Sequence, residues 1–367
     1  MFCIKSFTKL SEAEGDIKLL SNGVLYQRTL PRYNNRDILP PSISENLERF
    51  TKHLQPNLPR EWGATLHDAY TMKHGLTITN ENAIIEESLY NHFNRNEFYG
   101  FKKLNGGYTH AEFKSTYHLS TDLALLRLTT EDTFGHWLVE LLPRLSLYET
   151  LLDPHLSSWK IGISASSKLV GLTLRALQML GYQENRIIQL PDRPVSVDRM
   201  YFSSVRSLYP GWISPFAISF LQRLLPRHGQ KQNGLRLFVT RNDASDRHLT
   251  NIEEIQQLLS KYGYQRIDTG TLDFQEQIEL FSRAKSVVGI IGSALANIVF
   301  CETATPIIFL SPDTMAGTWF YDLASIKNLP YSVVYGPASQ RKKSYRSDFS
   351  VCREDVQAAL DSLELSA

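Results

Sequence analysis

The stretch Ser286-Val-Val-Gly-Ile-Ile-Gly-Ser-Ala-Leu-Ala-Asn297 decides the fold. It begins as an apolar, valine- and isoleucine-rich run, which favours a buried strand, and it turns at Gly292-Ser293 into a helical pattern. This order is typical of a Rossmann-like α/β domain. Backbone amides at the helix start can hold a phosphate, and Gly289 and Gly292 allow close approach of a ligand. A tight turn without a ligand is the alternative interpretation.

The residues around this stretch continue the alternation of strands and helices. Asn251 is placed to cap one helix and Asp273, with Glu276 three residues later, is placed to form a capping box for another. The predicted strands are 235–239, 264–267, 286–291, 305–310 and 331–334, and the predicted helices are 251–263, 273–284 and 294–300. A last helix over 354–363 carries apolar residues on one side and is expected to pack back onto the fold.

The N-terminal half shows the same alternation only from residue 121 onwards. Strands are predicted at 123–128, 160–163, 187–190 and 200–203, with helices at 133–151 and 168–180. We therefore expect an α/β protein with parallel sheets and two domains. The expected boundaries are an N-terminal domain 1–226 (irregular and β-rich over 1–120, α/β over 121–226), a polar linker 227–234, a C-terminal domain 235–345 and a final segment 346–367.

Composition excludes several classes of protein. The formal net charge of the 367 residues is +1, so no global field attracts nucleic acid or lipid. Three dispersed cysteines form no disulfide framework and fit reducing cytosol. No apolar segment reaches membrane-spanning length, and no secretory signal is expected. A basic run, 341–346, either contacts an anionic membrane surface or is a solvated loop.

Two arginines follow the first strand of the C-terminal domain. Arg241 and Arg247 bracket a turn-rich loop that lies at the carboxyl edge of the predicted sheet. One guanidinium group can bind two phosphate oxygens at once. Arg241 and Arg247 together can therefore neutralise a diphosphate without a metal. The alternative is that both are solvated and paired with Asp243 and Asp246.

The helix predicted over 133–151 carries a polar stripe. His136, Glu140 and Arg144 lie four residues apart, and Pro143 should bend the helix. A His–Glu pair at this spacing can supply a general base. A stripe on the protein surface is the alternative.

Several catalytic motifs are absent from the sequence. It contains no Asp-x-Asp, no His-Glu-x-x-His, no Cys-x-x-Cys and no Gly-x-Ser-x-Gly. These absences disfavour a metal-dependent enzyme and a serine hydrolase.

Four motifs follow one another along the chain: Phe134-Gly-His-Trp-Leu with Glu140 and Pro143-Arg144; Thr240-Arg241 with Arg247, Asn251 and Glu253; Phe274, Gln277, Phe281 and Ala284; and Gly289-x-x-Gly-Ser-Ala-Leu-Ala-Asn297 with Phe300. The match covers about three fifths of the chain, from residue 123 to 335. In this order the motifs resemble glycosyltransferase family 61, which includes bacterial capsular polysaccharide biosynthesis proteins.

The resemblance implies a GT-B arrangement, in which two Rossmann-like domains face each other across a cleft. It also implies an inverting, metal-independent hexosyl- or pentosyltransferase that needs no cofactor, because the nucleotide-sugar is a substrate. The acceptor would be an oligosaccharide or polysaccharide in cell-surface glycan synthesis. The enzyme would be cytoplasmic, with possible contact to the inner membrane face or to other assembly enzymes.

The resemblance also implies roles for individual residues. His136 and Glu140 would be catalytic on the acceptor side, with Arg144 beside them. The donor would contact Arg241, Arg247, Gln277, Gly292, Ser293, Ala294 and Asn297. Independently of the resemblance, the aromatic cluster Trp319-Phe320-Tyr321 makes Trp319 a candidate sugar platform on the acceptor side, although such a cluster is more often core.

Two positions depart from the family pattern. Ile291 stands where many members have His, and His248 stands where many have a second Arg. Two other functions stay open on the sequence: a polysaccharide pyruvyl transferase-like enzyme and a non-catalytic nucleotide-sugar-binding protein.

Overall fold

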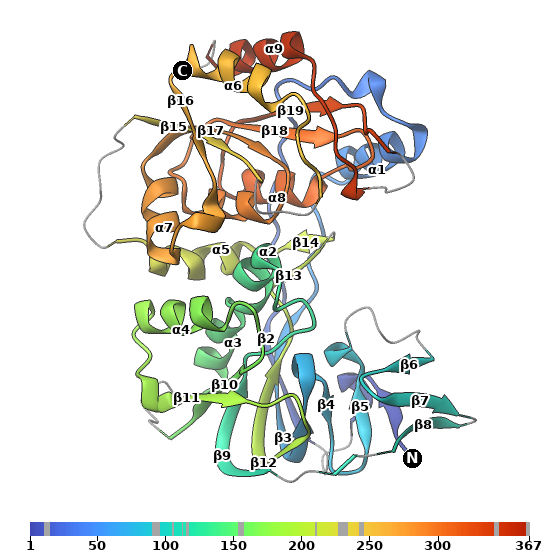
Figure 1. The fold of residues 1–367 in the computed structure, drawn as a ribbon. Helices are drawn as coiled ribbons and strands as arrows, with labels where there is room; N and C mark the ends of the chain where they lie inside the picture. Colours follow the sequence, from blue (N-terminus) through green and yellow to red (C-terminus); the bar gives the residue numbers. More distant parts are fainter. Residues whose placement is uncertain are drawn as a thin grey trace. The chain divides into compact units, whose positions relative to one another are not determined.

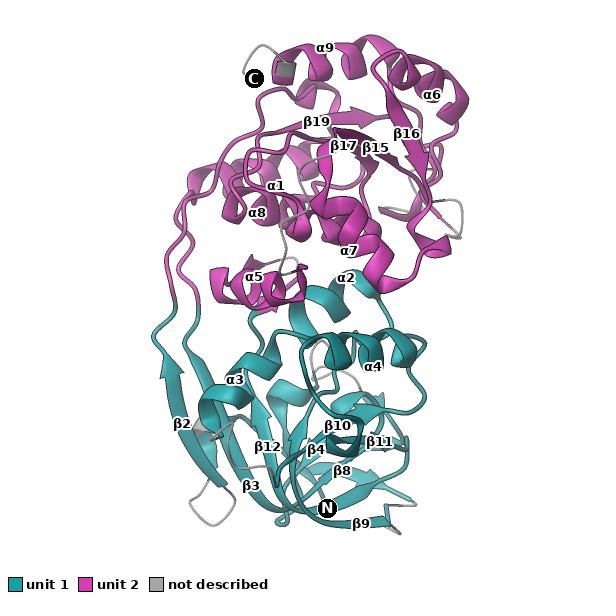
Figure 2. Ribbon diagram, turned by 90° about the vertical axis from the view of Figure 1, so that its left-hand side faces the viewer, with its two compact units in different colours: residues 1–23, 59–206 teal, residues 24–58, 207–367 magenta. Residues whose placement is uncertain are grey.

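The computed structural model describes residues 1–10, 15–89, 96–104, 106–111, 113–114, 117–152, 158–209, 211–226, 234–241, 246–340 and 345–364. The chain divides into two compact units, each of which is described by itself. Unit 1 consists of residues 1–23 and 59–206, and unit 2 of residues 24–58 and 207–367 (Figure 2). Most of the predicted linker, 227–233, lies outside the described residues.

Unit 2 is built on a parallel sheet of five strands in the order β16-β15-β17-β18-β19 (Figure 1). The chain runs from β15 to β16 on one side and then returns to place β17 on the other side of β15. The strands are β15 (Leu235–Val239), β16 (Tyr264–Ile267), β17 (Ala284–Ile290), β18 (Ile307–Pro312) and β19 (Tyr331–Gly336).

Helices cover both faces of this sheet, so its strands read as continuous apolar runs. One face packs on α6 (Ile252–Ser260) and α9 (Arg353–Glu364), which share a core cluster with Phe238, Val288 and Ile308. Also in unit 2 are α7 (Phe274–Ser282), α8 (Thr318–Ile326), the 3-10 helix Ser293–Phe300, β13 (Ser207–Leu208), β14 (Trp212–Ile213) and α5 (Pro215–Leu221).

Local sequence signals explain most of these elements. The capping box at α7 is confirmed: Asp273 accepts the amide of Glu276 at 2.8 Å, and Glu276 accepts the amide of Asp273 at 2.7 Å. The segment 294–300, predicted as a helix, forms a 3-10 helix. Its side chains are almost all apolar and buried, so packing decides its geometry.

An N-terminal segment completes unit 2. Residues 24–58, which the sequence prediction placed in the first domain, include the unpredicted helix α1 (Pro41–Lys52). Arg28 donates to Asp322 of α8 from Nε at 2.7 Å and from Nη2 at 2.9 Å, and the two side chains are 8% and 1% exposed. Because a buried charge is costly without its partner, this ion pair ties the segment to α8.

Unit 1 contains a mixed sheet in the order β1-β5-β4-β3-β12-β9-β10-β11, with β2 beside β3. The part from β12 to β11 is parallel, as predicted, whereas β3 pairs antiparallel with β12 and β2. The strands are β1 (Cys3–Lys5), β2 (Gly15–Ser21), β3 (Glu61–Thr71), β4 (Thr77–Ile78), β5 (Ala83–Ile85), β9 (Tyr117–Leu125), β10 (Lys160–Ser164), β11 (Ile187–Leu190) and β12 (Val195–Ser203).

The helices of unit 1 follow its parallel strands. After β9 come α2 (Phe134–His136), a π-helical turn Trp137–Leu141 and α3 (Arg144–Leu151), and α4 (Val170–Met179) follows β10. A small antiparallel sheet is formed by β6 (Glu97–Phe98), β7 (Phe101–Leu104) and β8 (Gly107–His110). In the part of the chain described here, no helix has the length and apolar character needed to cross a bilayer.

Candidate functional site

The strand order of unit 2 fixes where a ligand should bind. The connections that leave β15 and β17 run to opposite sides of the sheet, which makes the carboxyl ends of these neighbouring strands a topological switch point. Ligands of open α/β sheets bind at such a point. Arg241 lies just beyond β15, and Gly292 lies just beyond β17. The two sequence motifs therefore meet at one edge.

Arg241 and Gly292 are in close contact there. The Arg241 guanidinium occupies the space that a β-carbon at position 292 would need, so any other residue there would have to displace this arginine side chain. Nη2 of Arg241 also donates to Oδ1 of Asp246 at 3.3 Å. The side chains of Arg241 and Asp246 are 11% and 26% exposed. The alternative therefore holds in part for Arg241, which pairs with Asp246 as predicted but is mostly buried rather than solvated.

Arg247 is held in an unfavourable environment. Its φ of 57° lies in the left-handed region, which is rare for residues other than glycine. Burial, reinforced by the positive charge of Arg241, lowers the pKa of the Arg247 guanidinium to about 10. Its Nη1 faces the sulfur of Met315 at 3.2 Å, and its Nε has no hydrogen-bond partner among the described residues. A buried cation of this kind favours an anionic ligand.

The side chains of Gln277 and Asn297 form hydrogen bonds inside the fold, next to the turn at Gly292. Nε2 of Gln277 donates to the carbonyls of Thr269 and Leu272 at 3.1 and 3.2 Å, and its Oε1 accepts from Nδ2 of Asn297 at 2.9 Å. Asn297 is fully buried, and its Oδ1 accepts no hydrogen bond from a described residue. These two side chains hold α7 against the 3-10 helix. Ser293 and Ala294, at the start of that helix, are partly exposed.

Two other positions in unit 2 serve the core. Trp319 is 3% exposed, and its Nε1 donates to Ser207 Oγ at 3.3 Å, so its ring offers no open face to a sugar. The structure therefore agrees with the core alternative for this residue. Ile291 is fully buried, and its Cδ1 fills the space beside Gly317, which has a φ of 71°. Its apolar side chain packs where many family members carry His.

His136 and Glu140 form a close pair in unit 1. Nδ1 of His136 lies 2.7 Å from Oε2 of Glu140, with 20% of the His side chain and none of the Glu side chain exposed. Thr130 Oγ1 donates to the same carboxylate oxygen at 3.4 Å. The pair lies at a π-helical turn, in which Leu142 N bonds to the carbonyl of Trp137 at 2.9 Å. Such turns recur at functional sites. The surface-stripe alternative is wrong, because Glu140 is buried.

Arg144 is a structural residue in this conformation. It is fully buried, and burial lowers the pKa of its guanidinium. Nη1 donates to the carbonyl of Arg127 at 2.9 Å, while Nη2 and Nε donate to the carbonyl and Oγ of Ser203 at 2.9 and 3.2 Å. All of its donor nitrogens thus face groups that hold the helix against β9 and β12.

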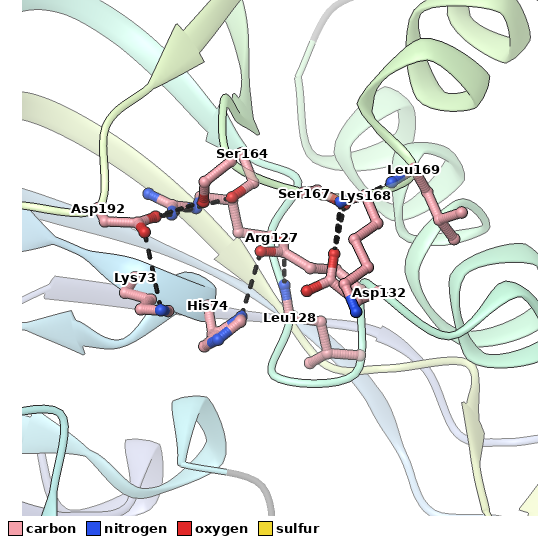
Figure 3. Close-up of polar contacts among 12 residues, drawn as sticks. Lys73, His74, Arg127, Leu128, Asp132, Ser164, Ser167, Lys168, Leu169 and Asp192 are labelled. Carbon is pink, nitrogen blue, oxygen red and sulfur yellow. Dashed lines mark hydrogen bonds and ion pairs between the residues drawn. The ribbon is translucent and has the colours of Figure 1, made fainter. Parts of the chain in front are cut away.

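A polar cluster that the sequence did not reveal lies at the carboxyl ends of β9, β10 and β11. Nη2 of Arg127 donates to Ser164 Oγ at 3.1 Å and to Asp192 Oδ1 at 3.4 Å (Figure 3). Lys73 Nζ lies 3.8 Å from the other oxygen of Asp192. Burial lowers the pKa of Arg127. The sequence offered one signal, a charged residue inside the apolar run 123–128.

A second His–Glu pair borders this cluster. His74, with a φ of 57°, places Nδ1 3.3 Å from Oε1 of Glu131. Glu131 is 2% exposed and directly follows Thr130, which contacts Glu140. The loop after β9 therefore connects two His–Glu pairs.

Comparison with known proteins bears on the chemistry of these groups. Residues 134–308, somewhat less than half of the chain, match the family model described as Glycosyltransferase 61. No curated protein sequence matches the chain. The matched region contains His136 and Glu140 of unit 1 and Arg241, Arg247 and Gly292 of unit 2. The match supports glycosyltransferase family 61, and on this basis the protein is a glycosyltransferase.

Proposed function

We propose that the protein is an inverting, metal-independent glycosyltransferase that uses a nucleotide-sugar donor and a glycan acceptor. The observation that carries this proposal is the position of Arg241 and Arg247 at the switch point of unit 2, beside the Gly292 turn. Two buried guanidiniums of like charge destabilise each other unless an anion lies between them. A nucleoside diphosphate is an anion of the right kind, and it is the leaving group of a nucleotide-sugar.

In the proposed reaction, one member of the His136–Glu140 pair removes a proton from an acceptor hydroxyl while the other orients it. The hydroxyl oxygen attacks the anomeric carbon, and the bond from that carbon to the diphosphate oxygen breaks. The diphosphate leaves with the bonding electrons, and Arg241, Arg247 and the amides after Gly292 stabilise its charge. The 2.7 Å contact between His136 and Glu140 supports this division of roles, in which either residue can act as the base.

The proposal includes a GT-B-type division of labour, with the donor on unit 2 and the acceptor on unit 1. It also includes a cytoplasmic location and a surface polysaccharide as the product. The residue types at the site support transfer without a metal, because guanidiniums replace the cation that usually neutralises a diphosphate.

A thermal-shift screen tests the donor class. UDP, GDP, CMP and phosphoenolpyruvate are compared on the full chain and on Arg241→Ala. A ligand at 100 times its Kd adds about 2.7 kcal/mol to the stability of the folded state. We expect one nucleotide to raise Tm in the wild type and to lose most of that effect in the variant. Stabilisation by phosphoenolpyruvate alone would favour a pyruvyl transferase.

Product analysis tests the reaction itself. With the nucleotide-sugar that the screen selects, we expect transfer in the presence of EDTA and inversion at the anomeric carbon, which proton NMR of the product detects. Loss of transfer in EDTA that Mg²⁺ or Mn²⁺ restores would overturn metal independence. If the protein binds the nucleotide-sugar but neither transfers the sugar nor hydrolyses the donor, it would be a non-catalytic nucleotide-sugar-binding protein.

A further inference from the structure

The segment after residue 345 is joined to the arginine loop by backbone pairing. Phe349 N donates to the carbonyl of His248 at 3.0 Å, and Thr250 N donates to the carbonyl of Phe349 at 2.7 Å. Arg247 N donates to the carbonyl of Arg346 at 3.4 Å. Residues 346–349 therefore lie alongside 247–250, and Arg346 is placed next to Arg247.

Three arginines share one carboxylate at this place. Asp246 accepts from Arg241 Nη2 at 3.3 Å through Oδ1, and its Oδ2 lies 3.9 Å from Arg346 Nε. Arg247, the residue next to Asp246, has a lowered pKa in spite of that carboxylate. Among the described residues, three guanidiniums therefore lie close to one carboxylate, and like charges at this separation favour the binding of a further anion.

The other described groups on these segments are either engaged by another residue or are not carboxylates. Asp348 is engaged by His248, whose backbone amide donates to it at 2.7 Å and whose Nδ1 lies 3.1 Å away. Tyr209 and Tyr345 lie near Arg247, but both are phenols rather than carboxylates, and burial raises the pKa of the Tyr209 hydroxyl. Residues 242–245 lie outside the described residues.

We propose that Arg346 completes a three-arginine site for the diphosphate of the nucleotide donor, and that Asp246 is the counter-ion that the diphosphate displaces. This inference rests on the proposed function and adds to it a residue that lies outside the matched region 134–308. The Arg346 side chain is 66% exposed and its contact with Asp246 is long, so it is free to turn onto a second anion. A diphosphate offers the charge and the oxygens for several bidentate contacts.

The proposal gives the basic run 341–346 a role different from membrane contact. Its described end, Tyr345 and Arg346, faces the arginine loop rather than standing apart from it. Residues 341–344 lie outside the described residues. The ligand is therefore assigned as a diphosphate, and binding to a lipid surface becomes an outcome of the test.

The first experiment measures binding of inorganic pyrophosphate to the full chain by calorimetry, for the wild type, Arg346→Ala, Arg346→Lys and Arg353→Ala. Arg353, an exposed arginine at the start of α9, controls for the loss of one positive charge. We expect Arg346→Ala to weaken binding about 10-fold or more, Arg346→Lys to restore part of it, and Arg353→Ala to leave it unchanged. Equal affinity in the wild type and Arg346→Ala would overturn the proposal.

Asp246→Ala provides an independent arm. Removing the resident counter-ion should tighten pyrophosphate binding and lower Tm in the absence of anions. Weaker binding in this variant, with the fold intact by circular dichroism, would contradict the assignment of Asp246.

Two further measurements separate the possible failures. If Arg346→Ala weakens pyrophosphate binding but no nucleotide-sugar is transferred by the wild type, the anion site stands and the proposed function fails. If the wild type transfers sugar and Arg346→Ala does so with unchanged KM for the donor, the proposed function stands and this inference fails. Co-sedimentation with phosphatidylglycerol vesicles that is lost in Arg346→Ala, with pyrophosphate binding unchanged, would replace the diphosphate by a membrane surface.

Discussion

The guanidinium of Arg241 lies against the backbone of Gly292, in the space that a β-carbon at position 292 would fill. This contact joins the loop after β15 to the turn after β17, and it means that the backbone after Gly292 and the first arginine are positioned by one another. A side chain at 292 must displace the arginine.

We therefore expect Gly292→Ala to weaken binding of the donor nucleotide about 10-fold or more while the protein remains folded. Calorimetry measures the affinity and circular dichroism the fold. Gly171→Ala is the control, because a β-carbon at 171 meets nothing within 4 Å. That change should be neutral or should stabilise α4 by about 0.5–1 kcal/mol. Unchanged affinity in Gly292→Ala would show that Arg241 does not need this position.

The His136–Glu140 pair gives a second prediction. Glu140→Gln keeps the shape of the side chain but cannot accept a proton, so kcat should fall about 10²–10⁴-fold. Donor affinity should not change, because Glu140 belongs to unit 1. Initial rates and nucleotide binding are measured on the same preparation.

The control for this prediction is Asp198→Asn, which breaks an exposed pair in the same unit. His118 Nε2 lies 3.0 Å from Asp198 Oδ1, and the two side chains are 59% and 45% exposed. Its kcat should stay at the wild-type value. Full transfer activity in a folded Glu140→Gln protein would assign the base elsewhere.

We expect replacement of Arg144 to lower the stability of the fold rather than to weaken acceptor binding. Arg144→Met leaves the carbonyls of Arg127 and Ser203 without their donor, at a cost of roughly 2–5 kcal/mol in the free energy of unfolding. Urea unfolding measures this loss. Arg199→Met removes a half-exposed ion pair to Asp122 and should cost less than about 1 kcal/mol. A stable Arg144→Met protein with a raised acceptor KM would restore the acceptor-side role.

We expect replacement of Arg247 to raise the stability of the fold and, at the same time, to weaken the binding of anions. In the folded state its pKa is lowered to about 10, so below that pH the charged form destabilises the fold, and this effect fades only as pH rises above 10. Arg247→Asn removes the charge and places a residue that tolerates a φ of 57°. At pH 7.5 we expect Tm to rise by about 2–4 °C without anions. The Tm gain from pyrophosphate should shrink. A lower Tm under both conditions would contradict this account.

We expect that a histidine at position 291 would not fit the fold of this chain. Ile291→His introduces a polar ring into a fully buried position beside Gly317, at a cost of about 2–4 kcal/mol. Thermal unfolding measures the loss. Ile17→His, at a position that is 45% exposed, should change stability by less than about 1 kcal/mol. Increased transfer activity in a stable Ile291→His protein would mean that the site accepts a further ligand there.

The sequence predicted the local features of unit 2 well. Helical spacing and the cap at Asp273 located α6 and α7, and apolar runs located β15 to β19, because each depends on neighbouring residues. Helix α1 was missed, although Pro41 stands at its first turn and Leu47 and Phe50 form a buried side.

Features that depend on distant residues could not be predicted. The antiparallel pairing of β3 with β12 joins residues more than 100 positions apart, and the pairing of 247–250 with 346–349 joins residues that are 99 to 101 positions apart. No local pattern encodes such contacts. The sequence therefore located Arg241, Arg247 and Gly292 individually, but not the sharing of Asp246 with Arg346. Pro143 predicted a bend, but the π-helical turn before it also depends on packing.

The tie between Arg28 and Asp322 has a consequence for how the protein is made. Unit 2 draws its parts from both ends of the chain, so on the ribosome residues 24–58 emerge long before the helix that they pack against. At about 5–20 residues per second, synthesis of the intervening chain takes on the order of tens of seconds. During that time the buried face of α1 has no partner from α8, and a cell that produces this enzyme in quantity should need a chaperone to shield the nascent segment.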